Sequence, residues 1–180
     1  MSPQVISNKF KNKAKKIKLL LLDVDGVLTD GRIIYDSKGN DLKLFDVHDG
    51  LGVYALRKMG IKTILITAKG SKATKPRARD MKIEKVYENI IPKTKVYEKI
   101  LRQYKLKDEN ICFVGDDLLD IGILKRAGLP ITVPNACLEV RKQSVYVTEK
   151  RGGRGAVREI AELILKSQDK WNKILAIYEE

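Results

Sequence analysis

The chain has 180 residues, of which 43% are hydrophobic and 33% are charged, and its formal net charge at pH 7 is +13. This length suits one domain with a sizeable core, and no apolar run approaches the ~20 residues of a membrane-spanning helix. The apolar run 17–22 is too short for a signal-peptide core, and no small-residue cleavage site follows it. We therefore expect a cytoplasmic protein.

The positive charge is concentrated in two segments. Residues 1–22 carry six lysines and no acidic residue, and residues 50–79 carry eight lysines or arginines and no acidic residue. Such segments are compatible with a nucleic-acid partner, with an anionic substrate, or with a solvated surface that has no specific partner. Because no nucleic-acid-binding motif accompanies the charge, we expect that the chain does not bind nucleic acid.

Predicted strands and helices alternate along the chain. In chain order we predict strand 17–22, a β-hairpin at 32–45, helix 50–59, strand 63–67, helix 72–81, strand 85–87, helix 94–104, strand 111–114, helix 118–127, strand 131–133, helix 137–142, strand 144–147 and a helix from 156 to about 176. Because Pro76 suits a first turn, the helix at 72–81 is expected to begin near Thr74. The alternation predicts an α/β, Rossmann-like parallel sheet with helices on both faces.

The hairpin at 32–45 interrupts this alternation. Two short apolar runs flank a turn rich in Gly and Asn, which is the pattern of two antiparallel strands. Since an isolated hairpin is marginal in water, its apolar residues are expected to pack against the body or another subunit. The predicted organisation is a basic N-terminal arm at 1–16, one domain at 17–166 that includes the hairpin, and a helical tail at 167–180.

Two carboxylates follow the first strand directly. Asp23 and Asp25 lie two residues apart, and Gly26 comes next. Asp and Gly after a strand are explained most simply by a turn. However, two anionic groups beside a dry strand end are unfavourable unless a cation, a proton or fixed hydrogen bonds compensate them. The pair is therefore also a candidate metal or catalytic site.

Other polar residues stand at the ends of later strands, where a parallel sheet gathers its ligands. Thr67 ends the second strand, Lys93 precedes a helix, and three carboxylates, Asp116, Asp117 and Asp120, follow the strand at 111–114. Asp117 and Asp120 also suit the cap and first turn of a helix, but Asp116 has no such simple role.

A glycine-rich loop, Gly152-Gly-Arg-Gly155, precedes the last helix. It is either an ordinary turn or a flexible clamp in which Arg154 holds an anion.

The order of these features resembles the four motifs of the haloacid-dehalogenase-like phosphatases. Within them, the segments 23–31, 45–52, 114–120 and 152–159 resemble the 3-deoxy-D-manno-octulosonate 8-phosphate phosphatase family. The likeness covers nearly all of residues 17–166. It implies a capless haloacid-dehalogenase-like fold in which the hairpin takes the place of a large cap domain.

The resemblance implies that Asp23 is the nucleophile and forms an aspartyl-phosphate. Asp25 would protonate the leaving alkoxide and then activate water. The cofactor Mg²⁺ would be held by Asp23, by the main-chain carbonyl of Asp25 and by Asp116, since Mg²⁺ prefers hard oxygen ligands.

Around this centre, Thr67 and Lys93 would hold the phosphoryl oxygens. Asp117 and Asp120 would lie behind the metal ligands, and Asp49 and Arg154 are the candidates for substrate contacts.

The resemblance also implies that the substrate is 3-deoxy-D-manno-octulosonate 8-phosphate, in lipopolysaccharide precursor synthesis. It further implies a homotetramer in which the hairpins of the subunits meet and the Gly-Gly-Arg-Gly loop closes the site of a neighbouring subunit. Two departures leave the sugar open: Ala68-Lys69 stands where relatives usually carry Gly-Arg, and His48 where they often carry Arg. The alternatives are a phosphatase for a related nonulosonate or other sugar phosphate, and a non-catalytic basic binding protein on the same fold.

Overall fold

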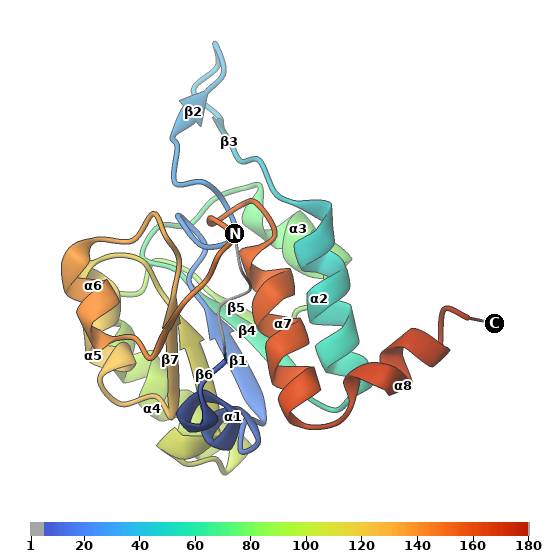
Figure 1. Ribbon diagram of the computed structural model, residues 1–180. Coiled ribbons are helices and arrows are strands. Elements are labelled where there is room, and N and C mark those ends of the chain that lie inside the picture. Colours follow the sequence, from blue (N-terminus) through green and yellow to red (C-terminus); the bar gives the residue numbers. More distant parts are fainter. Residues whose placement is uncertain (1–5, 180) are drawn as a thin grey trace.

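The computed structural model describes residues 6–179 and has a six-stranded sheet at its centre (Figure 1). The strand order is β5-β4-β1-β6-β7-β8, and every neighbouring pair is parallel. The strands are β1 (Leu19–Leu22), β4 (Lys62–Ile66), β5 (Lys85–Tyr87), β6 (Ile111–Val114), β7 (Leu129–Thr132) and β8 (Tyr146–Val147). The predicted parallel sheet is confirmed, and each strand lies within two residues of its expected bounds.

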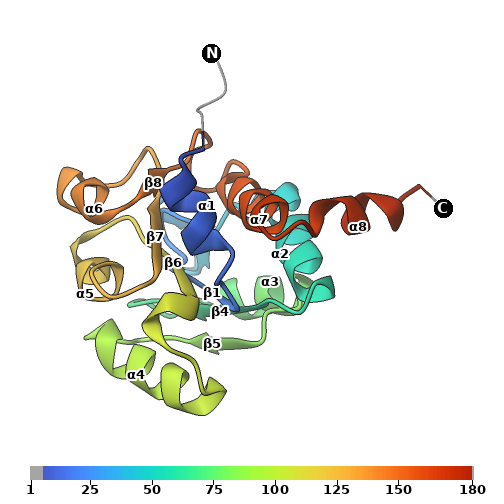
Figure 2. The ribbon, with the colours of Figure 1, turned by 60° about the horizontal axis from the view of Figure 1, so that its bottom comes forward.

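Helices cover both faces of this sheet, as predicted (Figure 2). They are α1 (Asn8–Ala14), α2 (Val47–Lys58), α3 (Thr74–Asp80), α4 (Lys93–Tyr104), α5 (Ile121–Leu124), α6 (Leu138–Gln143), α7 (Ala156–Ser167) and α8 (Trp171–Ala176), with 3₁₀ turns η1 (Asp108–Asn110) and η2 (Leu118–Asp120). The helix expected at 118–127 is thus divided between η2 and α5, whereas α3 begins at the expected Thr74.

The four leucines of β1 explain why this strand is central. Leu20 and Leu22 face a core formed with α1, α2, α3 and α7, while Leu19 and Leu21 face a second core formed with α4, α5 and α6. All four are buried, which is the pattern of a parallel strand covered on both sides. The carboxyl end of β1 is therefore held firmly where the loop at 23–31 begins.

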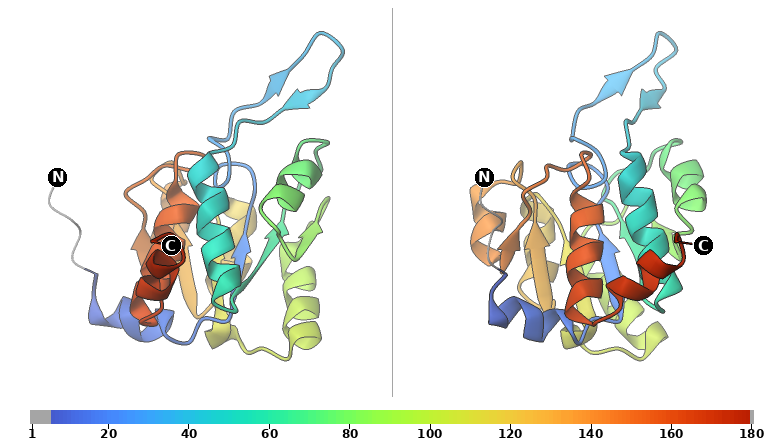
Figure 3. Two further views of the ribbon diagram at one scale, coloured as in Figure 1. Left: turned by 90° about the vertical axis from the view of Figure 1, so that its right-hand side faces the viewer. Right: turned by 45° about the vertical axis from the view of Figure 1, so that its right-hand side comes forward.

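The predicted hairpin consists of β2 (Ile34–Tyr35) and β3 (Asp41–Leu42), paired antiparallel. It extends away from the body at the carboxyl end of β1 (Figure 3). Its apolar side chains are exposed: Ile33, Ile34, Tyr35, Leu42 and Leu44.

The segment predicted as a basic arm is largely packed against the body, although residues 1–5 lie outside the described part. Residues 8–14 form α1, which buries Phe10 and Ala14 in the first core, and the ring of Phe10 lies 5.3 Å from that of Tyr146. Lys9 and Lys11 are exposed because the apolar side chains of α1 face the core, whereas Nζ of Lys13 donates to the carbonyl oxygen of Gly128 at 2.6 Å. The division into arm, domain and tail remains a prediction.

The single helix expected from 156 to about 176 is wrong in one respect, since the chain forms two helices there. α7 ends at Ser167, and Asp169 adopts a left-handed conformation with φ 56° before α8 begins at Trp171. Gln168 donates from Nε2 to the carbonyl oxygens of Ala14 and Ile17, which fixes the break to the segment between α1 and β1. Within residues 6–179, no helix is both long and apolar enough to cross a membrane.

Candidate functional site

The loop after β1 is the first component of the site. The N–H of Asp23 donates to the carbonyl oxygen of Val114 at 2.9 Å, which extends the pairing between β1 and β6 by one residue. Gly26 follows with φ 86°, and a Cβ at this position would overlap the carboxylate of Asp116. Glycine is therefore required here, because it allows the loop to approach Asp116 closely.

Three carboxylates meet at the carboxyl ends of β1 and β6. One oxygen each of Asp23, Asp116 and Asp120 lies within 4.8 Å of the others. They line a cavity of about 240 Å³, together with other residues from the loops at the strand ends. These other residues are Asp25, Gly31, Thr67, Ala68, Lys69, Lys93, Asp117 and Leu119. The structure thus brings seven of the nine predicted site residues into one cavity.

Lys93 supplies a buried positive charge beside these carboxylates. Its Nζ lies 2.7 Å from Oδ1 of Asp120 and 2.9 Å from Oδ1 of Asp23, and its side chain is only 3% exposed. Burial alone would lower the pKa of Lys93, but the charges of Asp23 and Asp120 raise it above its usual value. The ammonium is therefore a fixed cation at the base of the cavity.

The negative charge nevertheless exceeds what Lys93 compensates. Burial and the neighbouring charge of Asp120 raise the pKa of Asp23 to about 6, and burial with the charges of Asp23 and Asp120 raises the pKa of Asp116 to about 8. Oδ1 of Asp23 is buried and accepts no well-aligned hydrogen bond from the described residues. Hard oxygen donors that repel one another in this way fit a divalent cation such as Mg²⁺.

The hydrogen bonds distinguish Asp120 from the other two carboxylates. Its Oδ1 accepts from Lys93, and its Oδ2 accepts from the backbone N–H groups of Asp116 at 3.0 Å and Asp117 at 3.3 Å. Asp117 caps η2 by accepting from the N–H of Leu118. With both its oxygens engaged, Asp120 orients the loop and Lys93, which leaves Asp23 and Asp116 as the carboxylates free to face a cation.

Asp25 and Thr67 also line this cavity. The carboxylate of Asp25 is 36% exposed and faces Lys43 instead of the carboxylate cluster. The hydroxyl of Thr67 donates to the carbonyl oxygen of Lys69 at 3.1 Å. A phosphate oxygen bound by Thr67 would therefore take the place of this carbonyl oxygen as acceptor.

Asp49 and Arg154, the predicted substrate residues, are not brought into this cavity. Asp49 is 0% exposed, and its Oδ1 accepts a hydrogen bond from the N–H of Arg158 at the start of α7, so it offers no surface to a substrate. This position corrects the expectation of a direct contact by Asp49. Arg154 is exposed and lines a neighbouring cavity of about 360 Å³ with His48 and Asp46.

Two residues with structural roles at the site were missed by the sequence analysis. Asn135 donates from Nδ2 to the carbonyl oxygen of Gly26 and accepts from the N–H of Gly152, so it joins the loop at 23–31 to the glycine-rich loop. The hydroxyl of Thr29 accepts from the N–H groups of Gly26 and Gly31. Asn135 follows the strand β7, and this position after a strand is the sequence feature that could have indicated its place at the site.

Comparisons with known proteins identify the family of this chain. The family model of the haloacid dehalogenase-like hydrolases matches the sequence at residues 51–128. The 3-deoxy-D-manno-octulosonate 8-phosphate phosphatase KdsC of Yersinia pestis is 37% identical over 158 residues, which make up 88% of this chain and 84% of that protein. The KdsC of Salmonella typhi is 36% identical over 165 residues, or 92% of this chain and 88% of that protein.

Solved structures extend the comparison to the whole fold. The 3-deoxy-D-manno-octulosonate 8-phosphate phosphatase of Moraxella catarrhalis, solved in complex with a magnesium ion, a phosphate ion and a KDO molecule, is 39% identical with a TM-score of 0.93 and covers 96% of this chain and 99% of that chain. The cobalt-bound enzyme of Haemophilus influenzae is 32% identical with a TM-score of 0.84 and covers 88% of this chain and 92% of that chain. The chain therefore belongs to the 3-deoxy-D-manno-octulosonate 8-phosphate phosphatase family of the haloacid dehalogenase-like hydrolases.

Proposed function

We propose that this chain is a Mg²⁺-dependent phosphatase that hydrolyses 3-deoxy-D-manno-octulosonate 8-phosphate to the free sugar acid and phosphate. The observation that carries the proposal is the meeting of Asp23, Asp116 and Lys93 in one cavity at the carboxyl ends of the strands. A nucleophile, a cation site and a fixed positive charge are what a phosphoryl-transfer site must place together.

In the first half of the proposed reaction, an oxygen of Asp23 attacks phosphorus and the bond between phosphorus and the sugar oxygen breaks. Asp25 gives its proton to the departing alkoxide, so that the sugar leaves as an alcohol. Lys93, fixed by Asp120, stabilises the negative charge on the phosphoryl oxygens, and Thr67 donates its hydroxyl proton to one of them.

In the second half, water attacks the phosphorus of the aspartyl-phosphate and gives its proton to the carboxylate of Asp25, which releases phosphate and restores Asp23. The oxygens of Asp23 and Asp116 and the main-chain carbonyl of Asp25 would hold Mg²⁺. The bound ion would supply positive charge beside the phosphoryl group and relieve the repulsion that raises the pKa of Asp116.

The substrate is tested by a panel of phosphates ranked by kcat/KM with Mg²⁺ and with EDTA. 3-Deoxy-D-manno-octulosonate 8-phosphate is expected to rank first, and no phosphate should be released in EDTA. A nonulosonate 9-phosphate at the head of the panel would assign the chain to the related sugar-phosphate alternative. The family membership does not favour this alternative or a non-catalytic basic binding protein.

We further propose that the chain works in the cytoplasm as a homotetramer, in which the hairpin meets other hairpins and Arg154 closes a neighbour's site. Support comes from the exposed apolar side chains of the hairpin, among which Ile33 is 68% and Leu44 is 64% exposed. Light scattering of the wild type and of the Ile33→Ser/Leu44→Ser variant tests the assembly, and a mass of four chains is expected only for the wild type.

A further inference from the structure

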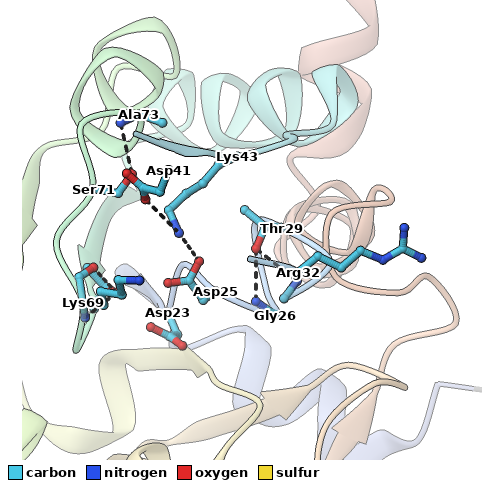
Figure 4. Close-up of polar contacts among 12 residues, drawn as sticks. Asp23, Asp25, Gly26, Thr29, Arg32, Asp41, Lys43, Lys69, Ser71 and Ala73 are labelled. Carbon is cyan, nitrogen blue, oxygen red and sulfur yellow. Dashed lines mark hydrogen bonds and ion pairs between the residues drawn. The ribbon is translucent and has the colours of Figure 1, made fainter. Parts of the chain in front are cut away.

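Lys43, which directly follows β3, makes the strongest polar contact between the hairpin and the loop at 23–31. This loop carries Asp23 and Asp25 and is called the catalytic loop. Nζ of Lys43 forms an ion pair and hydrogen bond with Oδ1 of Asp25, and it lies 4.0 Å from Oδ2 of Asp41 (Figure 4). The Lys43 side chain is 8% exposed although it belongs to a segment that projects into solvent. It is thus a nearly buried charge aimed at the residue that transfers the proton in the proposed reaction.

The surroundings of Lys43 show that the contact is not an ordinary surface ion pair. Oδ2 of Asp41 is buried and accepts no hydrogen bond from the described residues, so the ammonium is the cation nearest to a buried carboxylate oxygen. Lys43 therefore bridges two carboxylates, one in the hairpin and one in the catalytic loop. Loss of the Lys43 ammonium would leave the buried oxygen of Asp41 without a compensating charge, which is unfavourable. The contact therefore holds Lys43 in one position between the two carboxylates.

Two further lysines connect the hairpin to the loop after β4. Nζ of Lys69 donates to the hydroxyl of Tyr35 at 3.2 Å, and Nζ of Lys72 donates to Oδ1 of Asn40 at 3.4 Å. A hairpin with two residues in each strand is marginal on its own. These contacts hold β2 and the turn of the hairpin beside the loop after β4, and Lys69 of that loop lines the cavity.

We infer that Lys43 is a positioning residue, which holds the carboxyl group of Asp25 where it can protonate the leaving oxygen. The inference rests on the proposed function, because Asp25 needs a position only if it transfers a proton. Since proton transfer requires contact within hydrogen-bond reach, displacement of the carboxyl group by about 1 Å can reduce the rate about 10²-fold. The hairpin thus contributes to catalysis within its own chain.

The test compares Lys43→Met with the wild type on three substrates in the presence of Mg²⁺. These are 3-deoxy-D-manno-octulosonate 8-phosphate, a hexose 6-phosphate whose sugar has no carboxylate, and p-nitrophenyl phosphate, whose leaving group departs without a proton. We expect kcat/KM to fall about 10²-fold for both alkyl phosphates, the usual size of a general-acid contribution. For the aryl phosphate, kcat/KM should change less than about threefold, because this parameter reports the steps up to departure of the leaving group.

Three controls accompany this test. Lys43→Arg should restore at least a tenth of the wild-type kcat/KM, because a guanidinium reaches both carboxylates. Lys43→Met added to Asp25→Asn should cause little further loss, since the two residues act as one unit. Lys38→Met, on the same hairpin but exposed, should behave as the wild type.

Equal losses on all three substrates would mean that Lys43 only maintains the fold, and a loss confined to the sugar acid would mean that it binds the substrate carboxylate. Either result overturns the inference while the wild type remains an active phosphatase. A wild type without activity on any of the three phosphates would instead overturn the proposed function, and the inference with it.

Discussion

Oδ1 of Asp49, on α2, accepts a hydrogen bond from the backbone N–H of Arg158, on α7, at 2.9 Å. The N-cap of α7 is Gly155, which has no side chain to cap the helix. Asp49 therefore provides from another helix the acceptor that the first turn of α7 lacks. Because the Gly-Gly-Arg-Gly loop leads directly into this turn, the contact fixes where that loop ends.

Replacement of Asp49 tests this capping role. Asp49→Ala removes the acceptor and should lower the free energy of unfolding by about 1–2 kcal/mol, the usual cost of a lost N-cap. Asp49→Asn keeps an oxygen acceptor and should lose less. Urea denaturation measures both values, and trypsin cleavage after Arg151 or Arg154 should be faster in the Ala variant. Equal stability of the Ala and Asn variants would contradict the role.

The pKa of Asp49 gives the protein a specific pH dependence. Burial raises this pKa from 3.8 to about 6. Between these values the folded chain keeps a proton that the unfolded chain has released, so the stability from Asp49 is fully present below about pH 4 and is lost as the pH rises through 6.

Asp49→Asn has no carboxyl group to titrate and is therefore the reference against which the wild type is compared. The free energy of unfolding of the wild type, relative to that of the variant, should fall by up to about 3 kcal/mol between pH 4 and pH 7. Urea titrations across this range measure the difference. A difference that is constant with pH would show that Asp49 titrates at its ordinary pKa when the chain is folded.

Mg²⁺ binding should stabilise the fold through Asp116. Burial and acidic neighbours raise the pKa of Asp116 to about 8, so the ionised form that binds a cation is disfavoured in the metal-free protein. Mg²⁺ at 100 times its Kd should add about 2.7 kcal/mol. Thermal denaturation with Mg²⁺ and with EDTA should show this shift for the wild type and not for Asp116→Asn.

A matched control for this shift is Asp117→Asn, at an exposed carboxylate that caps η2. This variant should keep most of the response to Mg²⁺. The Asp116→Asn variant in EDTA should also be more stable than the wild type in EDTA. An Asp116→Asn variant that retains the full shift would show that the cation binds elsewhere.

Lys93 combines a structural and a catalytic role that can be separated. Lys93→Met leaves Asp23 and Asp120 without their buried cation and should cost about 3–5 kcal/mol of stability. Its kcat should fall at least about 10²-fold, since the phosphoryl oxygens lose a fixed charge. In the double variant Lys93→Met/Asp120→Asn, stability should recover while activity does not. If activity recovers as well, Lys93 has no direct contact with the phosphate.

Gly152 tests the close packing of the glycine-rich loop on the catalytic loop. A Cβ at Gly152 would overlap the carbonyl oxygen of Gly26 and lie 2.9 Å from that of Thr29. Gly152→Ala should therefore displace the catalytic loop and reduce kcat/KM about 10²-fold. Gly60→Ala is the control: its φ is +82° and no atom lies within 4 Å of the added Cβ, so stability alone should fall, by about 1 kcal/mol.

The sheet and most of the cavity were predictable from the sequence because their signals are local. Continuous apolar runs mark strands that are buried on both faces, as in β1, and the Asp and Gly residues at their ends mark the loops of the cavity. The ends of parallel strands meet at one edge of the sheet, so Asp23 and Asp116 were expected to approach each other although 93 residues separate them.

The remaining features depend on contacts that periodicity does not record. The left-handed Asp169 separates α7 from α8 although the apolar spacing continues across the break, and the lysines around Phe10 conceal that this ring is buried. The family resemblance made Asp49 a candidate for a substrate contact, and a charged residue is seldom buried without a partner, so its burial was not expected. Its partner, the N–H of Arg158, lies 109 positions away in the chain.

The central claim is that Asp23 carries the phosphoryl group during hydrolysis of a sugar-acid phosphate. The most direct measurement is the release of inorganic phosphate from 3-deoxy-D-manno-octulosonate 8-phosphate with Mg²⁺, for the wild type and for Asp23→Asn. The account predicts steady turnover by the wild type and a loss of at least about 10³-fold in the variant, because an amide cannot act as the nucleophile. Full activity in Asp23→Asn, or no release by the wild type, would contradict it.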